Sequence, residues 1–210
     1  DSIVLVAVNT PERNSIKLNS QFANANLDGK FKLSQLQDAL MNSISNYYDL
    51  NAKKTVAKEP QQLDFKIQLK DEPLLMKVLP QLKNMSAILV EGKFNSENDT
   101  IQVNASIPKT DYNGNVITNA SLKINKEENA LVYSLVVHDL KNASLHLPYT
   151  NISGKVEENT VDYVLQLKDI KDVERYLLSG TLKNTDGNSE VAFLNDNLKL
   201  NYETWQIDDN

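Results

Sequence analysis

Hydrophobic residues alternate with polar residues through most of this chain, and this period of two constrains the fold more than any other feature. Leu63, Phe65, Ile67 and Leu69, for example, alternate with aspartate, lysine and glutamine. Successive side chains of a β-strand point to opposite faces, so each alternating segment has one apolar face and one polar face. The pattern is typical of antiparallel strands that are covered on one side and solvated on the other.

The same alternation recurs almost to the C-terminus. Strand centres follow one another at intervals of about 10 to 19 residues, and no helical period separates most of them. The sequence therefore predicts an antiparallel meander without the crossover helices of a parallel sheet. The apolar positions of the further segments are Ile16, Leu18, Ile101, Val103, Ala105, Ile107, Leu122, Ile124, Leu131, Tyr133, Leu135, Val137, Leu145, Leu147, Val161, Tyr163, Leu165, Leu167, Leu178, Leu182, Val191, Phe193, Leu198, Leu200 and Tyr202.

Three dipeptides predict tight turns between these strands. Asn113-Gly114 and Asp186-Gly187 each separate two alternating segments, and Asp28-Gly29 offers a third turn. Asn-Gly and Asp-Gly favour the positive φ angles of type I′ hairpin turns. Residues 111–115 also have the residue types of a calcium loop. However, their glycine is at the fourth position rather than the sixth, so we interpret them as a hairpin turn.

Two helices are expected to interrupt the strands. Apolar residues spaced three or four apart predict an amphipathic helix over about residues 33–48. Asp71 as a cap, Pro73 in the first turn and Pro80 as a stop predict a short helix near residues 73–79. We expect both helices to cover apolar sheet surface or to close one end of it.

Composition excludes several classes of function. The 210 residues include no cysteine, which excludes zinc ribbons, disulfide scaffolds, thiol enzymes and iron–sulfur proteins. A net charge of −6 argues against nucleic acid as a partner, because phosphate binding needs a positive surface. The two histidines, His138 and His146, fall on polar strand faces. They could meet across a hairpin and bind a metal, but we interpret them as solvated and expect no metal and no cofactor.

Catalytic motifs are equally scarce. The sequence contains no nucleophile elbow, zinc-protease helix, phosphate-binding loop or dinucleotide fingerprint. A pair of carboxylates could serve a glycosidase, but the acidic residues cluster in turns and aromatic residues make up only 7% of the chain. We therefore expect that the protein is not an enzyme.

The apolar face of the strands is the remaining candidate for function. In a two-sheet β-sandwich this face is a closed core. In one long curved sheet, part of it stays open as an apolar trough, which a soluble protein tolerates only where something binds. Aliphatic side chains with few polar groups suit acyl chains, whereas a sugar or nucleotide needs convergent donors and acceptors. Both architectures stay open at this point.

Several segments resemble recurring elements of the TamB/AsmA-like translocation and assembly module proteins of Bacteroidetes. DEPLL at 71–75, LPQLK at 79–83 and EGKF at 91–94 resemble an element in which a short helix precedes strands of the form G-x-F. YLLSGTL at 176–182 and LKLNYETW at 198–205 resemble a GTL strand followed by an LNYE-x-W strand. Together with the alternating strands, these pieces cover most of residues 63–210.

The resemblance implies a periplasmic protein of the repeating β-groove family, built as a U-shaped β-taco. Such proteins are implicated in moving phospholipid between the inner and outer membranes and in outer-membrane protein assembly with a β-barrel partner. The chain would be an internal fragment, with the inner-membrane anchor outside it. Residues 1–60 would end a preceding unit, and residues 61–210 would form a groove segment. The two helices depart from the family, because an uninterrupted taco needs none.

The sequence thus predicts a mainly β fold, an antiparallel meander curved into a groove with two short helices, with a β-sandwich as the alternative. The predicted function is conduction of phospholipid acyl chains along the groove, without catalytic residues. The alternative is a chaperone that accepts an incoming strand, or a glycan-binding β-sandwich module. The predicted groove residues are Phe65, Ile67, Val103, Ile107, Leu122, Ile124, Tyr133, Leu135, Leu145, Leu147, Tyr163, Leu165, Leu182 and Phe193.

Overall fold

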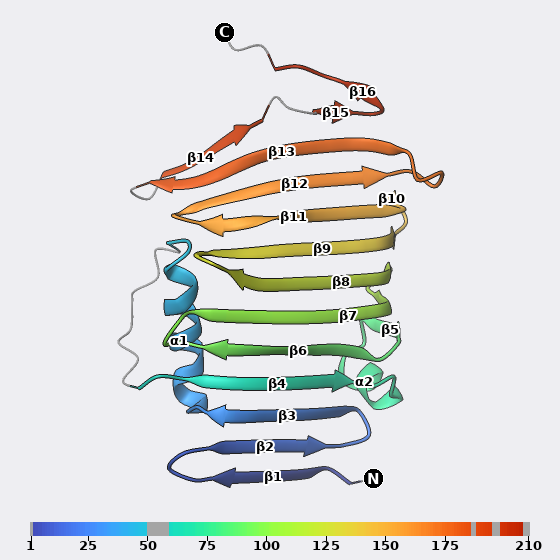
Figure 1. The fold of residues 1–210 in the computed structure, drawn as a ribbon. Coiled ribbons are helices and arrows are strands. Elements are labelled where there is room, and N and C mark those ends of the chain that lie inside the picture. The colour runs from blue at the N-terminus through green and yellow to red at the C-terminus, as the bar shows by residue number, and fades with distance from the viewer. Residues whose placement is uncertain (1, 50–58, 186–187, 195–197, 208–210) are drawn as a thin grey trace.

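The alternating segments pair into a single antiparallel sheet in the computed structural model, which describes residues 2–49, 59–185, 188–194 and 198–207. Most strands pair with the strand before and the strand after them in the chain, so they lie one above another in sequence order (Figure 1). The strands are β1 (Val4–Asn9), β2 (Asn14–Asn19), β3 (Ala23–Lys30), β4 (Gln62–Leu69), β5 (Leu82–Met85), β6 (Ile88–Asn95), β7 (Thr100–Tyr112), β8 (Asn115–Glu127), β9 (Ala130–Lys141), β10 (His146–Leu147), β11 (Tyr149–Glu157), β12 (Thr160–Lys168), β13 (Glu174–Thr185), β14 (Asn188–Phe193), β15 (Lys199–Leu200) and β16 (Glu203–Thr204).

The sheet runs in the order β1-β2-β3-β4-β6-β7-β8-β9-β11-β12-β13-β15-β16, and β5, β10 and β14 pair beside this path with β7, β9 and β13. The predicted mainly β, antiparallel, open curved fold is confirmed. The β-sandwich alternative is wrong, because all sixteen strands of the described ranges belong to one sheet. β3 pairs with β4 along its whole length, so the sheet continues unbroken across the boundary expected near residue 60.

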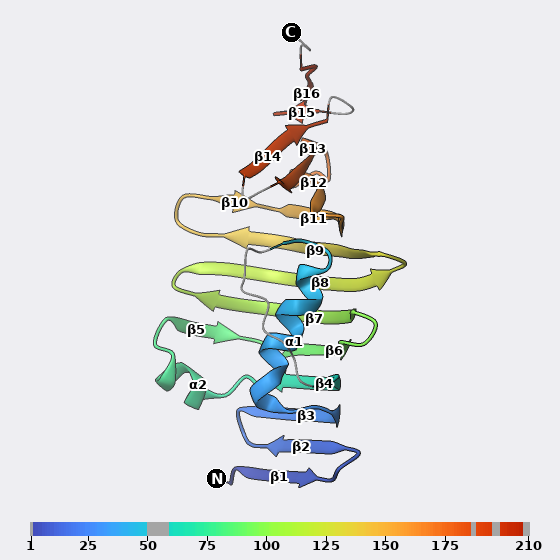
Figure 2. The ribbon, with the colours of Figure 1, turned by 90° about the vertical axis from the view of Figure 1, so that its left-hand side faces the viewer.

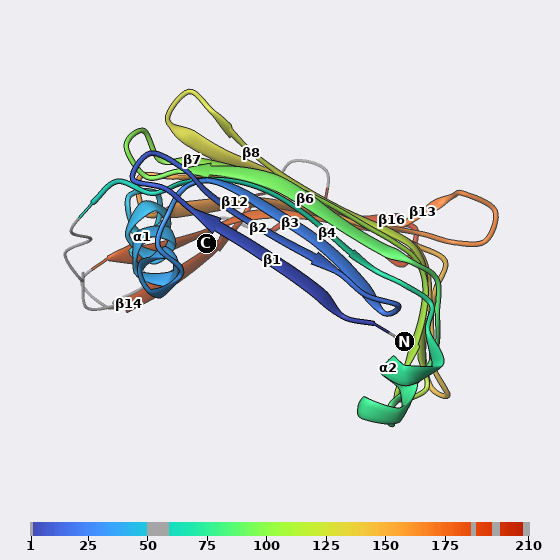
Figure 3. The same ribbon diagram turned by 90° about the horizontal axis from the view of Figure 1, so that it is seen from below.

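Two helices flank the sheet, as predicted. Seen along the stack of strands, the sheet bends, with α1 (Leu33–Ser45) beneath one end and α2 (Pro73–Val78) at the opposite end (Figure 3). α1 crosses several strands on one face (Figure 2). It is shorter than the predicted 33–48, because Asn46 caps it and a turn follows. Glu72 rather than Asp71 occupies the N-cap of α2, and its side chain makes no capping hydrogen bond.

The core lies between α1 and the strand ends that α1 covers. Ala39 and the side chains of Leu36 and Ile44 contact apolar residues that come from many strands. Burial of this kind stabilises a fold by about 25 cal/mol for each Å² of apolar surface removed from water. The buried members of this core are Phe31, Ala39, Tyr47, Leu63, Phe94, Ile101 and Leu131.

A buried amide fixes the position at which α1 begins. Lys32, the N-cap residue, has no side-chain cap, but its backbone N–H donates to Oε1 of Gln61 over 2.6 Å. The backbone N–H of Gln61 donates in turn to the hydroxyl of Ser96 over 2.8 Å. Because Gln61 is almost completely buried, these bonds join the start of α1 to β4 and to the loop after β6.

The turns follow the sequence in one case and not in another. Asn113 and Gly114 have φ angles of 52° and 78° between β7 and β8, so the predicted hairpin turn is confirmed. The turn predicted at Asp28-Gly29 is wrong, because both residues lie inside β3 and pair with β4. Long-range pairing outweighs the local turn preference here, and a Cβ on Gly29 would lie 2.2 Å from a β4 carbonyl. Asp186-Gly187 lies outside the described residues.

Two of the alternating segments form shorter strands than predicted. The segment containing Leu145 and Leu147 forms only the two-residue strand β10, because Pro148 follows and has no N–H to continue the ladder. The segment containing Leu200 and Tyr202 is divided by a turn, in which Asn201 and Tyr202 have positive φ angles.

Tyr47, just after α1, connects this helix to the loop before β7 by a hydrogen bond from its hydroxyl. Removal of that hydroxyl is expected to lower the stability of the fold. The hydroxyl donates to the carbonyl oxygen of Asp99 over 2.7 Å, and burial, followed by the Asp99 carboxylate, raises the pKa of Tyr47. We expect Tyr47→Phe to lower the free energy of unfolding by about 1 kcal/mol, measured by urea denaturation. Tyr48→Phe is the control, because the Tyr48 hydroxyl makes no hydrogen bond within the described residues. Equal effects of the two substitutions would contradict the role of this bond.

Candidate functional site

The strand register lines up one apolar residue from each of eleven strands into an unbroken row on the face that α1 crosses. Each member lies directly opposite the next across the strand pair. The pairing continues in this way to β13. With neighbouring strands about 4.8 Å apart, the row extends about 50 Å. We call it the first row: Leu5, Leu18, Ala25, Ile67, Val90, Ala105, Leu122, Leu135, Ile152, Leu165 and Leu178.

A second row runs beside the first, two residues nearer to the α1 end of the strands. It contains no charged side chain and ends on β14. Its members are Ala7, Ile16, Leu27, Phe65, Gly92, Val103, Ile124, Tyr133, Gly154, Tyr163, Gly180 and Phe193.

Three glycines in the second row make room for aromatic rings. A Cβ on Gly92 would lie 2.7 Å from the ring of Phe65, the residue opposite it on the preceding strand. A Cβ on Gly154 would lie 2.9 Å from the phenol oxygen of Tyr133, the residue opposite it on β9. A Cβ on Gly180 would lie 2.5 Å from the phenol oxygen of Tyr163, the residue opposite it on β12. Each ring therefore lies across a neighbouring glycine, at a position where a larger residue would collide with the ring.

The two rows differ from the core in how far they are covered. The core side chains under α1, such as Leu63 and Phe94, are less than a tenth exposed. The first-row residues from β2 to β13 are only half-buried, although most are large and aliphatic, and Leu5 is 64% exposed. A cavity of about 410 Å³ opens at the β1 end of the second row, between Ala7, Ile16 and the start of α1. Much of this apolar face is thus in contact with solvent.

No fixed charge lies within either row. The hydroxyl of Tyr133 donates to the carbonyl oxygen of Asp162 over 3.0 Å. Burial, and to a lesser extent the Asp162 carboxylate, raises the pKa of Tyr133, so its phenol stays neutral at physiological pH. The rows offer a ligand apolar contact and little else.

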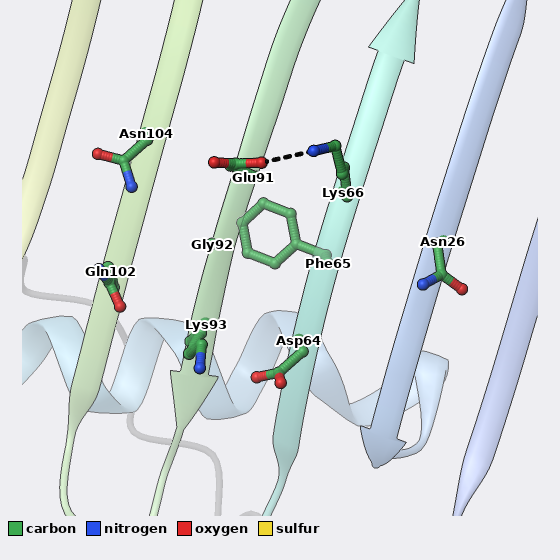
Figure 4. Close-up of a pocket in the computed structure, with 9 residues that line it drawn as sticks. All are labelled: Asn26, Asp64, Phe65, Lys66, Glu91, Gly92, Lys93, Gln102 and Asn104. Atoms are coloured by element: carbon green, nitrogen blue, oxygen red, sulfur yellow. Dashed lines mark ion pairs between the residues drawn. The ribbon is translucent and has the colours of Figure 1, made fainter.

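The opposite face of the sheet is polar and charged. Figure 4 views it with α1 behind the sheet, where Lys66 and Glu91 form an ion pair of 3.0 Å. Asp64, Lys93 and several amides surround this pair around a depression of about 320 Å³. In most strands this arrangement agrees with the sequence prediction of one apolar and one polar face.

The register places most of the predicted groove residues together. Ile67, Leu122, Leu135 and Leu165 belong to the first row. The second row contains Phe65, Val103, Ile124, Tyr133, Tyr163 and Phe193, while Ile107 and Leu182 lie next to the two rows, opposite Ala120 and Val161.

Leu145 and Leu147 do not join the rows. Leu147 pairs with Leu140 in β10 at the far end of β9, and Leu145 lies in the preceding loop, 44% exposed. The sequence prediction also missed members of the rows. Val90 was hidden because it lies in a continuous apolar run, and the glycines were missed because they have no side chain. An isolated glycine inside an alternating strand was the available signal.

The histidines do not form a metal site in the described part of the chain. His146 Nε2 lies 2.6 Å from the carboxylate of Asp139, and His138 packs edge-to-face on Tyr149 with ring centroids 5.7 Å apart. Within the described ranges, no three histidine or acidic side chains gather in a way that could hold a metal ion.

Comparisons of the chain with protein-family models, curated proteins and solved structures find no match. Neither helix of the described residues has the length and hydrophobicity needed to cross a membrane.

Proposed function

We propose that this chain is a periplasmic segment of a TamB-like envelope protein whose apolar face conducts phospholipid acyl chains between the inner and outer membranes. The observation that carries the proposal is the first row, which passes through eleven strands without a polar member. An acyl chain laid along it gains about 25 cal/mol for each Å² of apolar surface that it buries.

The uniformity of the rows supports movement rather than tight binding at one place. A ligand is held at a fixed position by a few convergent polar groups, and the rows lack them. Successive aliphatic side chains offer an acyl chain nearly equal contacts, so no single step along the row is expected to trap it. The polar opposite face favours water, which directs lipid to the apolar face alone.

The wider setting of the protein follows from the family resemblance and is part of the proposal. The full-length protein would have an inner-membrane anchor outside this chain and an outer-membrane β-barrel partner. Support of outer-membrane protein assembly would use the same apolar face. No nucleic acid, cofactor or enzymatic activity is part of the proposed function.

A second candidate function is a chaperone for unfolded outer-membrane polypeptide. The edge strand β1 favours it, because most of its residues are large, aliphatic and about half exposed. An extended polypeptide could add to such an edge by backbone hydrogen bonding. The two candidates differ in what contacts the first row away from β1.

Photo-crosslinking from adjacent positions on β12 tests the proposal. A photoreactive amino acid at Leu165, in the first row, is expected to capture phospholipid when the chain is incubated with vesicles of phosphatidylethanolamine and phosphatidylglycerol. The same amino acid at Val164 is the matched control, because it is next to Leu165 on the opposite face. Val164 is 37% exposed and Leu165 is less exposed, so non-specific labelling would favour the control.

Mass spectrometry of the adducts decides between the outcomes. We expect at least about tenfold more phospholipid adduct at Leu165 than at Val164. Such a ratio corresponds to a difference of about 1.4 kcal/mol in the free energy with which the two faces bind lipid. Leu135 with its neighbour Val136 gives an independent second pair on β9. Equal labelling at both faces would refute the proposal, and capture of added unfolded polypeptide without lipid would favour the chaperone.

A further inference from the structure

The row of strand positions that α1 covers changes from apolar to polar near the start of the helix. On β4 and β6 this row consists of Leu63 and Phe94, which belong to the core. The register continues the same row through Gly29 of β3 to Asn14 of β2 and Asn9 of β1. α1 begins after β3 and runs away from β1, so it does not cross these last two strands (Figures 1 and 2). Space therefore remains beside the start of the helix.

Two adjoining cavities occupy this space, and they differ in chemistry. The first, of about 410 Å³, extends from Ile16 in the second row to Leu33, the first residue of α1. The second, of about 260 Å³, is bounded by the β1–β2 hairpin and by residues 59–61. The residues that line both cavities are Asn9, Asn14, Phe31 and Lys32. An apolar space thus adjoins a polar one, which suits a ligand that has one apolar and one polar part.

The second cavity is positively charged, although the protein as a whole has a net charge of −6. The charged residues that line it are Arg13, Lys30, Lys32 and Glu59. The hydrogen bond and charge of Lys32, followed by the charge of Lys30, lower the pKa of Glu59, so both lysines lie near this carboxylate. Lys30 forms no ion pair within the described residues, and the pair of Lys32 with Glu59 is half exposed. Exposed ion pairs contribute little, so both lysines are available to an anion.

The start of α1 adds unpaired hydrogen-bond donors to the same place. The backbone N–H groups of Leu33 and Ser34 have no acceptor within the described residues, no side chain caps the helix, and its first turn has no acidic residue. A helix N-terminus carries a partial positive charge, which favours a negatively charged group. Nδ2 of Asn14 donates to the carbonyl oxygen of Phe31, whereas its Oδ1 is buried without a partner in the described chain. A headgroup hydroxyl can donate to this oxygen.

We propose that the two cavities together hold an anionic phospholipid, with its phosphate near Lys30, Lys32 and the start of α1 and an acyl chain on the second row. The inference rests on the proposed function, because it names the headgroup charge of the lipid whose acyl chains the rows conduct. A zwitterionic headgroup brings its own cation to the two lysines and is therefore expected to bind more weakly. The lysines and the N–H groups of the helix belong to β3 and α1, so a further strand paired along the outer edge of β1 leaves them in place.

Short-chain phospholipids test the headgroup preference without a membrane. Dihexanoylphosphatidylglycerol and dihexanoylphosphatidylcholine have the same acyl chains and dissolve as monomers, so isothermal titration calorimetry with the chain compares their headgroups directly. We expect the anionic phosphatidylglycerol to bind at least about fivefold more tightly than the zwitterionic phosphatidylcholine at low salt. This preference is expected to decrease as the salt concentration is raised from about 0.05 M to about 0.5 M, because salt screens the attraction between the lysines and the phosphate.

Lys30→Gln removes the unpaired charge from the site. Lys30 is exposed and is the last residue of β3, so the fold is expected to persist. We expect the preference for phosphatidylglycerol to decrease by about threefold or more, with unchanged binding of phosphatidylcholine. Lys17→Gln is the matched control, because Lys17 is an exposed lysine on the polar face of β2 and lies outside both cavities. It is expected to leave the preference unchanged.

Leu33→Glu and Leu33→Gln test the start of α1 independently. Leu33 is 61% exposed, and the two replacements have nearly the same size but differ in charge. We expect the glutamate variant to lose the preference for phosphatidylglycerol and the glutamine variant to keep it. A glutamate in the first turn stabilises a helix, so the melting temperature of the glutamate variant is expected to stay the same or rise. Loss of binding without loss of stability would assign the effect to the ligand rather than to the fold.

Three outcomes would overturn the inference. The unsubstituted chain could bind neither short-chain lipid, it could bind both with equal affinity, or Lys30→Gln and Lys17→Gln could have equal effects. Preferential phospholipid crosslinking at Leu165 over Val164 would still stand in each case, so the headgroup site would fail alone. Equal crosslinking at these two positions, together with a preference for phosphatidylglycerol that depends on Lys30, would instead refute conduction along the rows and leave an anionic lipid site beside α1.

Discussion

Gly154→Ala is expected to lower the free energy of unfolding by about 3 kcal/mol, the upper part of the usual range for overpacking. A Cβ at this position would lie 1.9 Å from the backbone carbonyl oxygen of Asp162 on β12. It would also lie 2.9 Å from the phenol oxygen of Tyr133. A backbone atom cannot rotate away, so β11 and β12 would have to separate. Urea denaturation monitored by circular dichroism measures the effect.

Gly114→Ala is the matched control for this substitution. A Cβ on Gly114 would meet no atom within 4 Å, but its φ of 78° is unfavourable for alanine. Its cost is therefore conformational only, about 1 kcal/mol. Adding Tyr133→Ala to Gly154→Ala removes the ring but not the Asp162 carbonyl, and is not expected to restore stability. Equal costs for Gly154→Ala and Gly114→Ala would show that the close strand approach is absent.

Leu135→Asp is expected to reduce phospholipid transfer by more than about tenfold, because an acyl chain crossing this position would have to desolvate an unpaired carboxylate. Leu135 belongs to the first row and lies near the middle of strand β9. It is only half-buried, so the new carboxylate can stay hydrated and the fold is expected to persist. Transfer of a fluorescent phospholipid between donor and acceptor vesicles, with the chain added, is the measurement.

Val136→Asp is the control on the opposite face. It adds the same charge to the same strand, one residue along, but on the polar side. We expect transfer within about twofold of the unsubstituted chain, because the apolar rows stay intact. Unchanged transfer with Leu135→Asp would refute conduction along the first row. Equal loss with both variants would point to a general effect of charge or stability.

The faces of the strands could be predicted from the sequence, because alternation depends only on local spacing. Ile67, Leu135 and Leu165 lie on the same face of the sheet for this reason. Which residues face each other across strands depends on register, which residues far apart in the chain decide together. The turn predicted at Asp28-Gly29 is wrong for the same reason, since pairing with β4 overrides a local preference.

The candidate site was predicted in outline and missed in detail. The glycines of the second row become meaningful only when Tyr133 and Tyr163 lie over them, and that needs the register. Leu145 and Leu147 were included because alternation alone does not show where a strand ends. The extent to which α1 covers the face also could not be predicted, because a helix that follows β3 can pack on either end of the sheet.

The neighbour-to-neighbour pairing of the strands has a consequence for how such a protein can change in evolution. Nearly all contacts join adjacent strands, so the sheet behaves like a one-dimensional lattice in which each hairpin is a separable unit. Within the described residues, α1 is the one helix that links several of these units under one set of core contacts. Hairpins inserted beyond α1 would lengthen the structure without requiring the core to be redesigned. Length is then an almost independent variable, which mutation can change by adding or removing hairpins.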